Sequence, residues 1–236
     1  MAQGALDCIE TALARDWHVC IVSHKTLQTP ERFGSRDLRA PAKEWLARAE
    51  PRFAHALSLT GPPPLRLRED GFAALFDAIV SQQVSVASAD AIWRRLDAAG
   101  LTAPDRLALA RDEDLRACGL SRQKARYGRA LAAAGIDFAA LREAPTDAVI
   151  ATLVAVPGIG PWTAEIYAMF CLGRADVFAP GDLALQEAMR RLFALEARPT
   201  ERAARAMAAA WSPWRGVAAR ILWAYYRVET DREGLR

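Results

Sequence analysis

The fold of this chain is decided by a stretch that reads Val156-Pro157-Gly158-Ile159-Gly160-Pro161-Trp162-Thr163-Ala164 and is followed by Val177-Phe178-Ala179-Pro180-Gly181-Asp182. Apolar residues recur at helical spacing on both sides of the first run, which predicts two short helices joined by a very tight turn. A proline–glycine pair ends the first helix, and a glycine–proline pair suits the cap and the first position of the second. The amides that open the second helix carry the positive end of its dipole. The hairpin is therefore predicted to hold a phosphate through Gly158, Ile159 and Gly160.

The overall composition is that of an ordinary globular protein. The 236 residues include 31 Lys and Arg against 28 Asp and Glu, and 52% of them are hydrophobic. This length can bury a substantial core as one domain or two modest ones. No apolar run is long enough to span a membrane, and the N-terminus lacks the layout of a signal peptide, so we expect a cytoplasmic protein with no membrane partner. The small positive charge permits nucleic-acid binding without demonstrating it.

The potential metal ligands are scattered. Cys8, Cys20, Cys118 and Cys171 are far apart and form no Cys-x-x-Cys pair. We interpret them as buried free thiols, because neither a disulfide framework nor a metal ribbon fits this spacing. The histidines all lie in the first quarter of the chain. We therefore expect no catalytic metal.

From residue 41 onward the pattern is helical, and no convincing period-two strand interrupts it, which predicts an all-α fold. The first 41 residues are less regular, and we interpret residues 1–41 as a poorly ordered N-terminal extension. Outside the hairpin, helices are expected from about residue 42 to the Gly61 stop and over residues 72–80, 84–96, 103–109, 112–118, 121–134, 182–193, 200–210 and 215–227. In the extension we expect a short helix near 5–17, an extended patch near 19–22 and a loop from 23 to 41.

The hairpin and the later Pro180-Gly181-Asp182 together resemble the helix-hairpin-helix and Gly-Pro-Asp (HhH-GPD) superfamily of DNA base-excision glycosylases. Within it, they are most similar to the AlkA-type branch of DNA-3-methyladenine glycosylase II. A tight Gly-x-Gly turn alone also occurs in ligases and polymerases, so the joint pattern carries the resemblance, over residues 42–236. It implies two helical lobes, residues 42–70 with 181–236 and residues 71–180, with the active-site cleft between them.

Asp182 is the candidate catalytic residue. It follows a Pro-Gly pair and precedes an apolar helical pattern, so local sequence alone favours an ordinary helix N-cap. The resemblance implies a catalytic carboxylate at the same place, and the two roles are compatible. Helix amides stabilise an ionised carboxylate, and cleavage of an N-glycosidic bond passes through a positively charged sugar that a nearby anion stabilises. Whether Asp182 also deprotonates the attacking water stays open.

Trp162 stands where the strand-cutting members of the superfamily carry a lysine that forms a Schiff base. The nearest lysine, Lys124, belongs to a different helix, and no cysteine follows Cys171. The resemblance therefore implies a monofunctional enzyme that uses water, leaves an abasic site and carries no iron–sulfur cluster. In relatives a monovalent cation bridges the hairpin carbonyls and a phosphate, and no residue of this sequence tests that feature.

Trp162 and Trp214 match aromatic residues of the family's base pocket, where a cationic alkylated purine can stack. Without the resemblance, tryptophans in a helical protein are more simply explained as core. Ile166 and Leu183 occupy pocket positions that carry tyrosine in a well-known member. The pocket is thus expected to be less aromatic, which leaves the range of lesions open.

The segment Ser81-Gln82-Gln83-Val84-Ser85 joins two helices and resembles the family's wedge loop. Gln83 matches the residue that fills the gap left by a flipped base, with Gln82 and Ser85 beside it. A solvated turn between helices explains the same residues equally well.

A second element, residues 120–125, resembles a phosphate-binding helix start of the family. Ser121 is placed to cap this helix, and Lys124 follows in its first turn. A solvated basic face is the alternative explanation for Lys124. The partner implied is double-stranded DNA containing damaged bases, bound by a monomer.

The resulting hypothesis is a DNA glycosylase that flips out alkylated purines of the 3-methyladenine type and hydrolyses the N-glycosidic bond with water. One alternative is a non-catalytic helix-hairpin-helix protein that only binds DNA. Another is a glycosylase of the same fold that removes deaminated or oxidised bases. The free bases released from differently damaged DNA distinguish these three.

Overall fold

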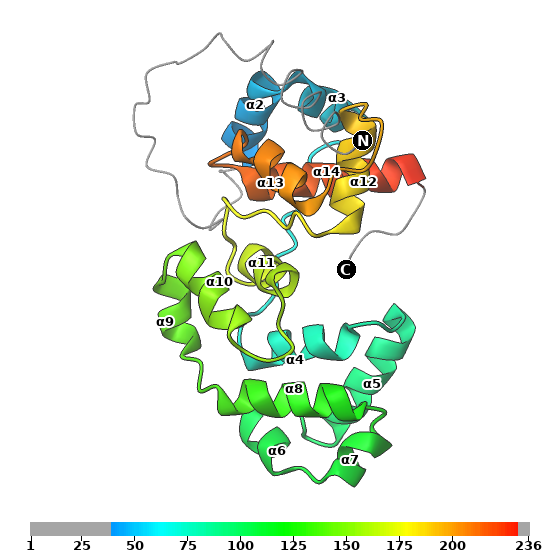
Figure 1. Cartoon of the computed structure of the whole chain (residues 1–236), viewed down its shortest axis with the longest axis vertical. Helices are drawn as coiled ribbons and strands as arrows, with labels where there is room; N and C mark the ends of the chain where they lie inside the picture. The colour runs from blue at the N-terminus through cyan, green and yellow to red at the C-terminus, as the bar shows by residue number, and fades with distance from the viewer. Residues whose placement is uncertain (1–38, 231–236) are drawn as a thin grey trace, which may run out of the picture. The chain divides into compact units, whose positions relative to one another are not determined.

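A computed structural model describes residues 39–230, in which helices are joined by loops and no segment forms a β-strand (Figure 1). The all-α fold is confirmed. The helices are α2 Arg39–Ala49, α3 Pro51–Thr60, α4 Phe72–Ser81, α5 Val86–Ala98, α6 Pro104–Leu109, α7 Asp112–Ala117, α8 Arg122–Ala133, α9 Phe138–Glu143, α10 Thr146–Val154, α11 Pro161–Phe170, α12 Leu183–Leu192, α13 Glu201–Ala209 and α14 Arg215–Thr230. None of these described helices is long and apolar enough to cross a membrane.

The predicted helix ends follow from local chemistry. Gly61 and Gly100 adopt φ values of 64° and 67°, a left-handed conformation that stops α3 and α5. The Ser121 hydroxyl accepts the N–H of Lys124 at 3.3 Å and so caps α8. Pro161 occupies the first turn of α11, where a missing N–H costs nothing.

The helices differ from those expected in two places. The single helix expected before Gly61 is two helices, because Pro51 starts a new one and the Glu50 side chain caps it by accepting the N–H of Arg52 at 3.1 Å. A proline at this place cannot continue the preceding helix. The structure also has a short helix, α9, that was not expected from the sequence; its cap is Asp137.

Most of the expected N-terminal extension, residues 1–38, lies outside the described residues, together with the helix expected near 5–17, the patch near 19–22 and the thiols of Cys8 and Cys20. The described part begins with α2 at Arg39. The loop expected through residue 41 is therefore wrong at its last residues.

The described helices pack in two groups, which Figure 1 shows in its upper and lower parts. In the first, named the terminal helix group, α14 packs against α2, α3 and α12, and α13 packs against α12. In the second, the central helix group, α4 packs against α5, α8 and α11, while α6 and α7 pack on α8 and α10 packs on α11. The predicted lobe limits near 70 and 180 fall in loops between the groups, and the division into lobes stays a prediction.

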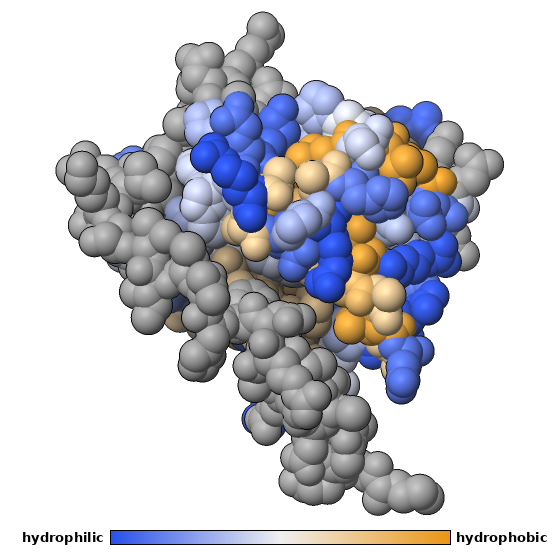
Figure 2. All heavy atoms as spheres, turned by 90° about the horizontal axis from the view of Figure 1, so that it is seen from above, coloured by the Kyte–Doolittle hydropathy of each residue, from blue (hydrophilic) through white to orange (hydrophobic). Residues whose placement is uncertain are grey.

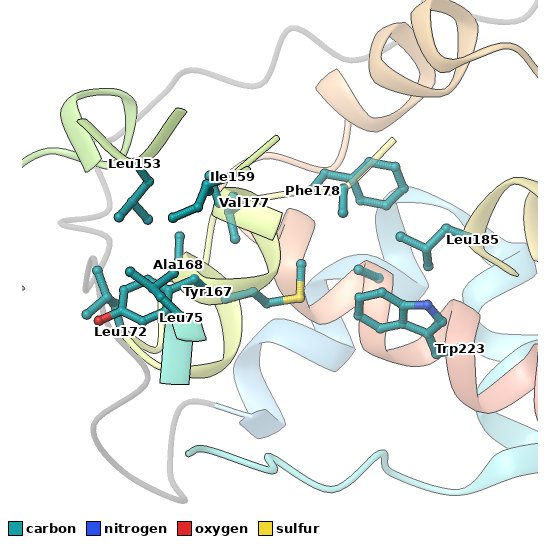
Figure 3. Packing of buried hydrophobic residues seen from close by; sticks show 14 of the residues in the cluster. Leu75, Leu153, Ile159, Tyr167, Ala168, Leu172, Val177, Phe178, Leu185 and Trp223 are labelled. Atoms are coloured by element: carbon teal, nitrogen blue, oxygen red, sulfur yellow. The ribbon is translucent and has the colours of Figure 1, made fainter. Parts of the chain in front are cut away.

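The buried side chains of residues 39–230 form one continuous cluster that reaches both groups. Figure 3 shows it running from Leu153 and Ile159 at the hairpin to Phe178, Leu185 and Trp223. Burying one side chain of this size stabilises the fold by about 1.5–3 kcal/mol. The hairpin and the start of α12 are therefore anchored in the same core.

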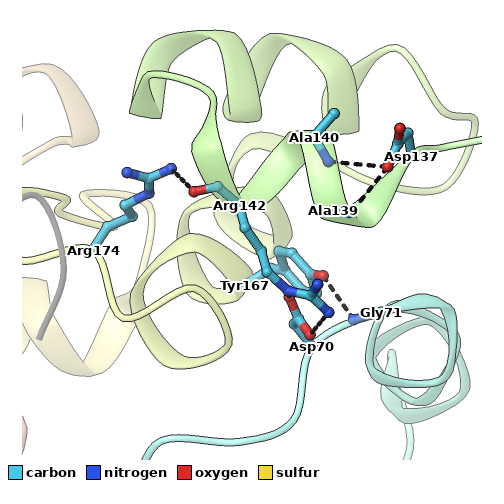
Figure 4. A network of polar contacts seen from close by, with 8 residues as sticks. All are labelled: Asp70, Gly71, Asp137, Ala139, Ala140, Arg142, Tyr167 and Arg174. Atoms are coloured by element: carbon cyan, nitrogen blue, oxygen red, sulfur yellow. Dashed lines mark hydrogen bonds and ion pairs between the residues drawn. The ribbon is translucent and has the colours of Figure 1, made fainter. Parts of the chain in front are cut away.

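A polar network fixes the segment that leads into α4 (Figure 4). The Gly71 N–H donates to the Tyr167 hydroxyl at 2.8 Å, and both Arg142 nitrogens Nε and Nη2 donate to Asp70 at 2.6 and 2.8 Å. Arg174, which is 1% exposed, donates to the backbone carbonyl of Arg142 at 2.9 Å. These bonds tie Asp70 to α9, and Gly71 to α11 of the central helix group.

The surface drawn in Figure 2 mixes hydrophilic and hydrophobic residues. Among the described residues, the large exposed hydrophobic side chains come from several separate elements, with Leu109 the most exposed at 85%. Hydrophobic residues scattered in this way are normal on a globular protein.

Candidate active site

Asp182 caps helix α12. Its Oδ1 accepts the backbone N–H of Leu185 at 2.9 Å, and the residue is only 6% exposed. The N-cap expected from the sequence is confirmed, and the carboxylate lies at the positive end of the helix dipole.

Two tryptophan indoles complete the surroundings of this carboxylate. Trp162 Nε1 donates to Asp182 Oδ2 at 2.9 Å, and Trp223 Nε1 donates to Asp182 Oδ1 at 3.1 Å. Trp162 comes from α11 of the central helix group, and Trp223 from α14 of the terminal helix group. A buried anion is therefore held by three neutral N–H donors, which satisfy it without cancelling its charge.

Trp223 is the residue of this site that the sequence analysis missed. Nothing in the local pattern of α14 separates it from the other apolar residues there, because only packing against α12 brings its indole to Asp182. Trp214, which was assigned to the pocket, is 8% exposed, so protein covers most of its ring. Its pocket role stays a prediction.

The remaining pocket candidates differ in exposure. Leu183, directly after Asp182, is 63% exposed, and Trp162 is 38% exposed. Ile166 is partly buried and packs against the core one turn after Trp162. Leu183 and part of the Trp162 surface are thus accessible, while Ile166 contributes mainly to packing.

The loop that leads to Asp182 is held at both ends. At its start, the Arg215 guanidinium donates to both oxygens of Asp176, at 2.6 and 2.9 Å, and the Ser212 hydroxyl donates to the same carboxylate at 2.8 Å. At its end, Gln186 Nε2 donates to the Pro180 carbonyl at 2.7 Å. Two-point anchoring of this kind gives the cap residue a fixed position.

The hairpin turn has the geometry expected from its glycines, but each glycine serves a different purpose. Gly158 has a φ of 93°, and a Cβ added there would lie 2.4 Å from Cγ of Tyr127, so packing within the protein requires glycine. At Gly160 an added Cβ would meet no atom of residues 39–230 within 4 Å, apart from its chain neighbours. Ile159 between them is 3% exposed and anchors the turn in the core. Gly160 is thus the position where a ligand can approach the backbone closely.

The segment assigned as the wedge loop lies against the hairpin. Gln82 Nε2 donates to the carbonyl of Gly158 at 2.9 Å. Gln83 is exposed and has a φ of 56°, which is uncommon for a residue with a side chain. Ser85 caps α5 by accepting the N–H of Ser88 at 3.2 Å. The structure brings Gln82 to the hairpin and leaves the Gln83 side chain in solvent, where its wedge role stays a prediction.

The start of α8 adjoins the same surface, since Tyr127 of this helix packs on Gly158. Lys124 Nζ donates to the Val80 carbonyl at 2.7 Å, near the C-terminal end of α4. Partial burial lowers the pKa of the Lys124 ammonium group. In this structure Lys124 therefore stabilises a helix end, and its contact with a phosphate stays a prediction, as does that of Ser121.

Among residues 39–230, no group of three or more His, Cys, Asp or Glu side chains could hold a metal ion. Of the described cysteines, Cys118 is buried and Cys171 is partly buried, and both are free thiols. Burial raises the pKa of the Cys171 thiol to about 12. Asp182 supplies a buried carboxylate, which can stabilise a positive charge or accept a proton.

Comparison with known proteins identifies the class. The model of the HhH-GPD superfamily of base excision DNA repair proteins matches residues 76–215, which include the hairpin and Asp182. The chain belongs to this superfamily. Within it the chain belongs to the AlkA-type branch, together with relatives that are named as 3-methyladenine DNA glycosylases.

Two solved structures resemble this one over most of both chains. DNA-3-methyladenine glycosidase from Bacillus halodurans is 31% identical, with a TM-score of 0.72 over 81% of this chain and 90% of that chain. The 3-methyladenine DNA glycosylase of Schizosaccharomyces pombe, solved with abasic DNA, is 26% identical, with a TM-score of 0.67 over 79% and 95%.

Two curated relatives are longer proteins than this chain. DNA-3-methyladenine glycosylase 2 of Escherichia coli is 30% identical over 177 residues, which cover 68% of this chain and 60% of that protein. A Bacillus subtilis relative is 32% identical over 124 residues, or 51% and 43% of the two chains. The chain thus spans about half the length of these curated relatives.

Proposed function

We propose that this protein is a monofunctional DNA glycosylase of base-excision repair that removes alkylated purines of the 3-methyladenine type. It flips the damaged base out of double-stranded DNA, hydrolyses the N-glycosidic bond with water and leaves an abasic site. The observation that carries the proposal is the buried Asp182 carboxylate, held by neutral donors beside a turn with an open backbone. The names of the relatives support the choice of lesion.

In the proposed reaction, Asp182 stabilises the positive charge that develops on the sugar as the bond to the base breaks. A fixed anion whose donors among the described residues are neutral N–H groups is effective here because the low-dielectric surroundings screen it little. Alkylation has already made the base a good leaving group, so no strong acid is required. The water that attacks the sugar is either deprotonated by the same carboxylate or loses its proton after bond cleavage.

DNA is held mainly through its backbone. We assign phosphate contacts to the amides around Gly160 and to the start of α8, where Ser121 lies, and gap filling to Gln83. A monovalent cation could be held by the hairpin carbonyls, although the Gly158 carbonyl already accepts Gln82. We propose no other cofactor, and we propose that a monomer acts on DNA in the cytoplasm.

The test is base release by Asp182→Asn. This variant keeps an oxygen for the helix cap but removes the charge, so release of 3-methyladenine from alkylated DNA should fall at least ~100-fold while binding to DNA changes little. Free bases are measured by chromatography, and DNA affinity by fluorescence anisotropy. Wild-type rates in Asp182→Asn exclude Asp182 from the mechanism.

A second candidate is a glycosylase with the same catalytic carboxylate and another lesion. It is favoured by Ile166 and Leu183, aliphatic residues that offer a cationic purine less stacking than aromatic ones. Deaminated and oxidised DNA substrates, tested beside alkylated DNA, distinguish the two. If no substrate releases a base while salt-sensitive DNA binding persists, the protein only binds DNA.

A further inference from the structure

We propose that the indole N–H of Trp162 positions the Asp182 carboxylate, so that Trp162 is a positioning residue as well as a surface for the base. The inference rests on the proposed function, in which Asp182 is the catalytic group. Its starting point is the 2.9 Å bond between Trp162 Nε1 and Asp182 Oδ2.

The two carboxylate oxygens of Asp182 have different surroundings. Oδ1 accepts two N–H groups, from the Leu185 backbone and from Trp223, and an oxygen of this type has two lone pairs. Oδ2 accepts the N–H of Trp162. One lone pair of Oδ2 is therefore left for a water molecule or for the sugar, and the direction of that lone pair depends on Trp162.

The donors to Asp182 also come from different parts of the protein. Leu185 and Trp223 belong to helices α12 and α14, which pack against each other in the terminal helix group together with the cap itself. Trp162 belongs to α11 in the central helix group, and it is two residues from Gly160. The bond to Oδ2 thus connects the carboxylate to the turn that we propose holds the DNA backbone.

Helix α11 is held against the terminal helix group by further contacts. Three residues after Trp162, the buried Glu165 accepts Arg205 Nη2 of α13 at 3.0 Å. Near the end of the helix, the Met169 carbonyl accepts Arg220 Nη2 of α14 at 3.0 Å. Trp162 is therefore presented to Asp182 by a fixed helix, even though 38% of its own surface is exposed.

The rival explanation is that Trp162 only provides an aromatic face. Two variants separate the roles, because Trp162→Phe keeps a flat ring and loses the donor, whereas Trp162→Ala loses both. We expect single-turnover base release by Trp162→Phe to fall ~10- to 100-fold, with DNA affinity within about 3-fold of the wild type. Trp162→Ala should lose a similar factor in rate and bind lesion-containing DNA more weakly as well. Trp45→Phe in α2 controls for the loss of an indole elsewhere and should leave both quantities unchanged.

A spectroscopic measurement tests the bond without any activity. In a ¹H–¹⁵N spectrum, the Trp162 indole N–H, assigned through its loss in Trp162→Phe, should exchange with solvent at least ~10-fold faster in Asp182→Asn than in the wild type. Circular dichroism establishes that each variant is folded.

Wild-type release rates in Trp162→Phe, or an indole N–H whose exchange does not respond to Asp182→Asn, overturn the inference. The proposed function fails differently. If the wild type releases no base from any damaged DNA, the assignment as a glycosylase is wrong, while the exchange measurement still decides whether Trp162 holds Asp182.

Discussion

At the scale of single residues, the main finding is a buried carboxylate whose described partners are three neutral N–H groups. An arginine or lysine partner would stabilise Asp182 more strongly, but it would also cancel the charge that a positive sugar needs. Neutral donors fix the orientation of the anion and leave its charge available. Of the two indole donors, Trp223 is the more deeply buried, because it is 8% exposed, against 38% for Trp162, and belongs to the core.

The contribution of Trp223 can be measured with Trp223→Phe. The variant leaves Leu185 as the donor to Oδ1, so we expect the free energy of unfolding to fall by about 1–2 kcal/mol and base release to slow ~10-fold. Urea denaturation and single-turnover kinetics measure these effects. Trp211→Phe is a matched control, since Trp211 is 3% exposed and packs on Phe53 and Phe178. It should lose stability and keep the wild-type rate. Equal rates in both variants would contradict a role for the Trp223 donor.

At the scale of elements, the hairpin depends on helices that are distant in sequence. Gly158 packs directly under Tyr127 of α8, and its carbonyl accepts Gln82 at the end of α4. Residues of α8 and the end of α4 thus support the turn at Gly158, while Gly160 faces open space. Gly158 is therefore the glycine required for packing of the turn, and Gly160 is the glycine at which a ligand can approach the backbone.

Two alanine variants test this division of roles. Gly158→Ala forces a Cβ against Tyr127 and strains a positive φ, so we expect it to lose about 1–3 kcal/mol of stability. The new Cβ of Gly160→Ala meets no described residue within 4 Å apart from its chain neighbours, so this variant should unfold at the wild-type temperature, yet bind DNA several-fold more weakly. Thermal denaturation and fluorescence anisotropy with an abasic duplex measure both. The proposed phosphate contact is wrong if Gly160→Ala binds DNA as tightly as the wild type.

At the scale of the whole described molecule, α11 joins the two helix groups. Arg220 of α14 donates to the carbonyls of Leu65 and Met169 and lies over the Phe170 ring at 4.4 Å. Its burial lowers the pKa of the guanidinium to about 10. Nearer the start of α11, Glu165 pairs with Arg205 of α13. Burial raises the pKa of the Glu165 carboxyl. Charged side chains thus hold α11 in a defined orientation against α13 and α14, which non-directional apolar packing alone does not specify.

The Glu165–Arg205 pair predicts a pH-dependent effect on stability. Because the pKa of Glu165 is higher in the folded protein than in the unfolded chain, its contribution to stability falls as pH rises through the folded value. Arg205 offsets part of the free-energy cost of burying the ionised Glu165 carboxylate. The free energy of unfolding of Arg205→Gln should therefore be lower than that of the wild type by about 1–2 kcal/mol at pH 7.5 and by less than ~1 kcal/mol at pH 5, as measured by urea denaturation.

Arg202→Gln, an exposed position on the same helix, serves as the control and should stay within ~0.5 kcal/mol of the wild type at both pH values. A loss in Arg205→Gln that is the same at pH 5 and pH 7.5 would show that Glu165 is not the group involved.

The sequence alone determined the local features of this protein. Helical periodicity, proline and glycine stops and polar caps identified the hairpin, most helices and the N-cap at Asp182, because these depend on interactions between residues near one another in the chain. Local rules failed where two signals competed, as at Pro51, and where a helix was too short for periodicity to show, as in α9.

Only the tertiary structure decided which side chains meet. Packing between segments far apart in the sequence produces three contacts of this kind. Trp223 donates to Asp182, Tyr127 covers Gly158, and Lys124 donates to the Val80 carbonyl. A hydrophobic pattern states that a tryptophan is buried but not which atom its N–H will face, because that depends on how helices cross. The sequence therefore determined the carboxylate, and the tertiary structure decided the donors that hold it.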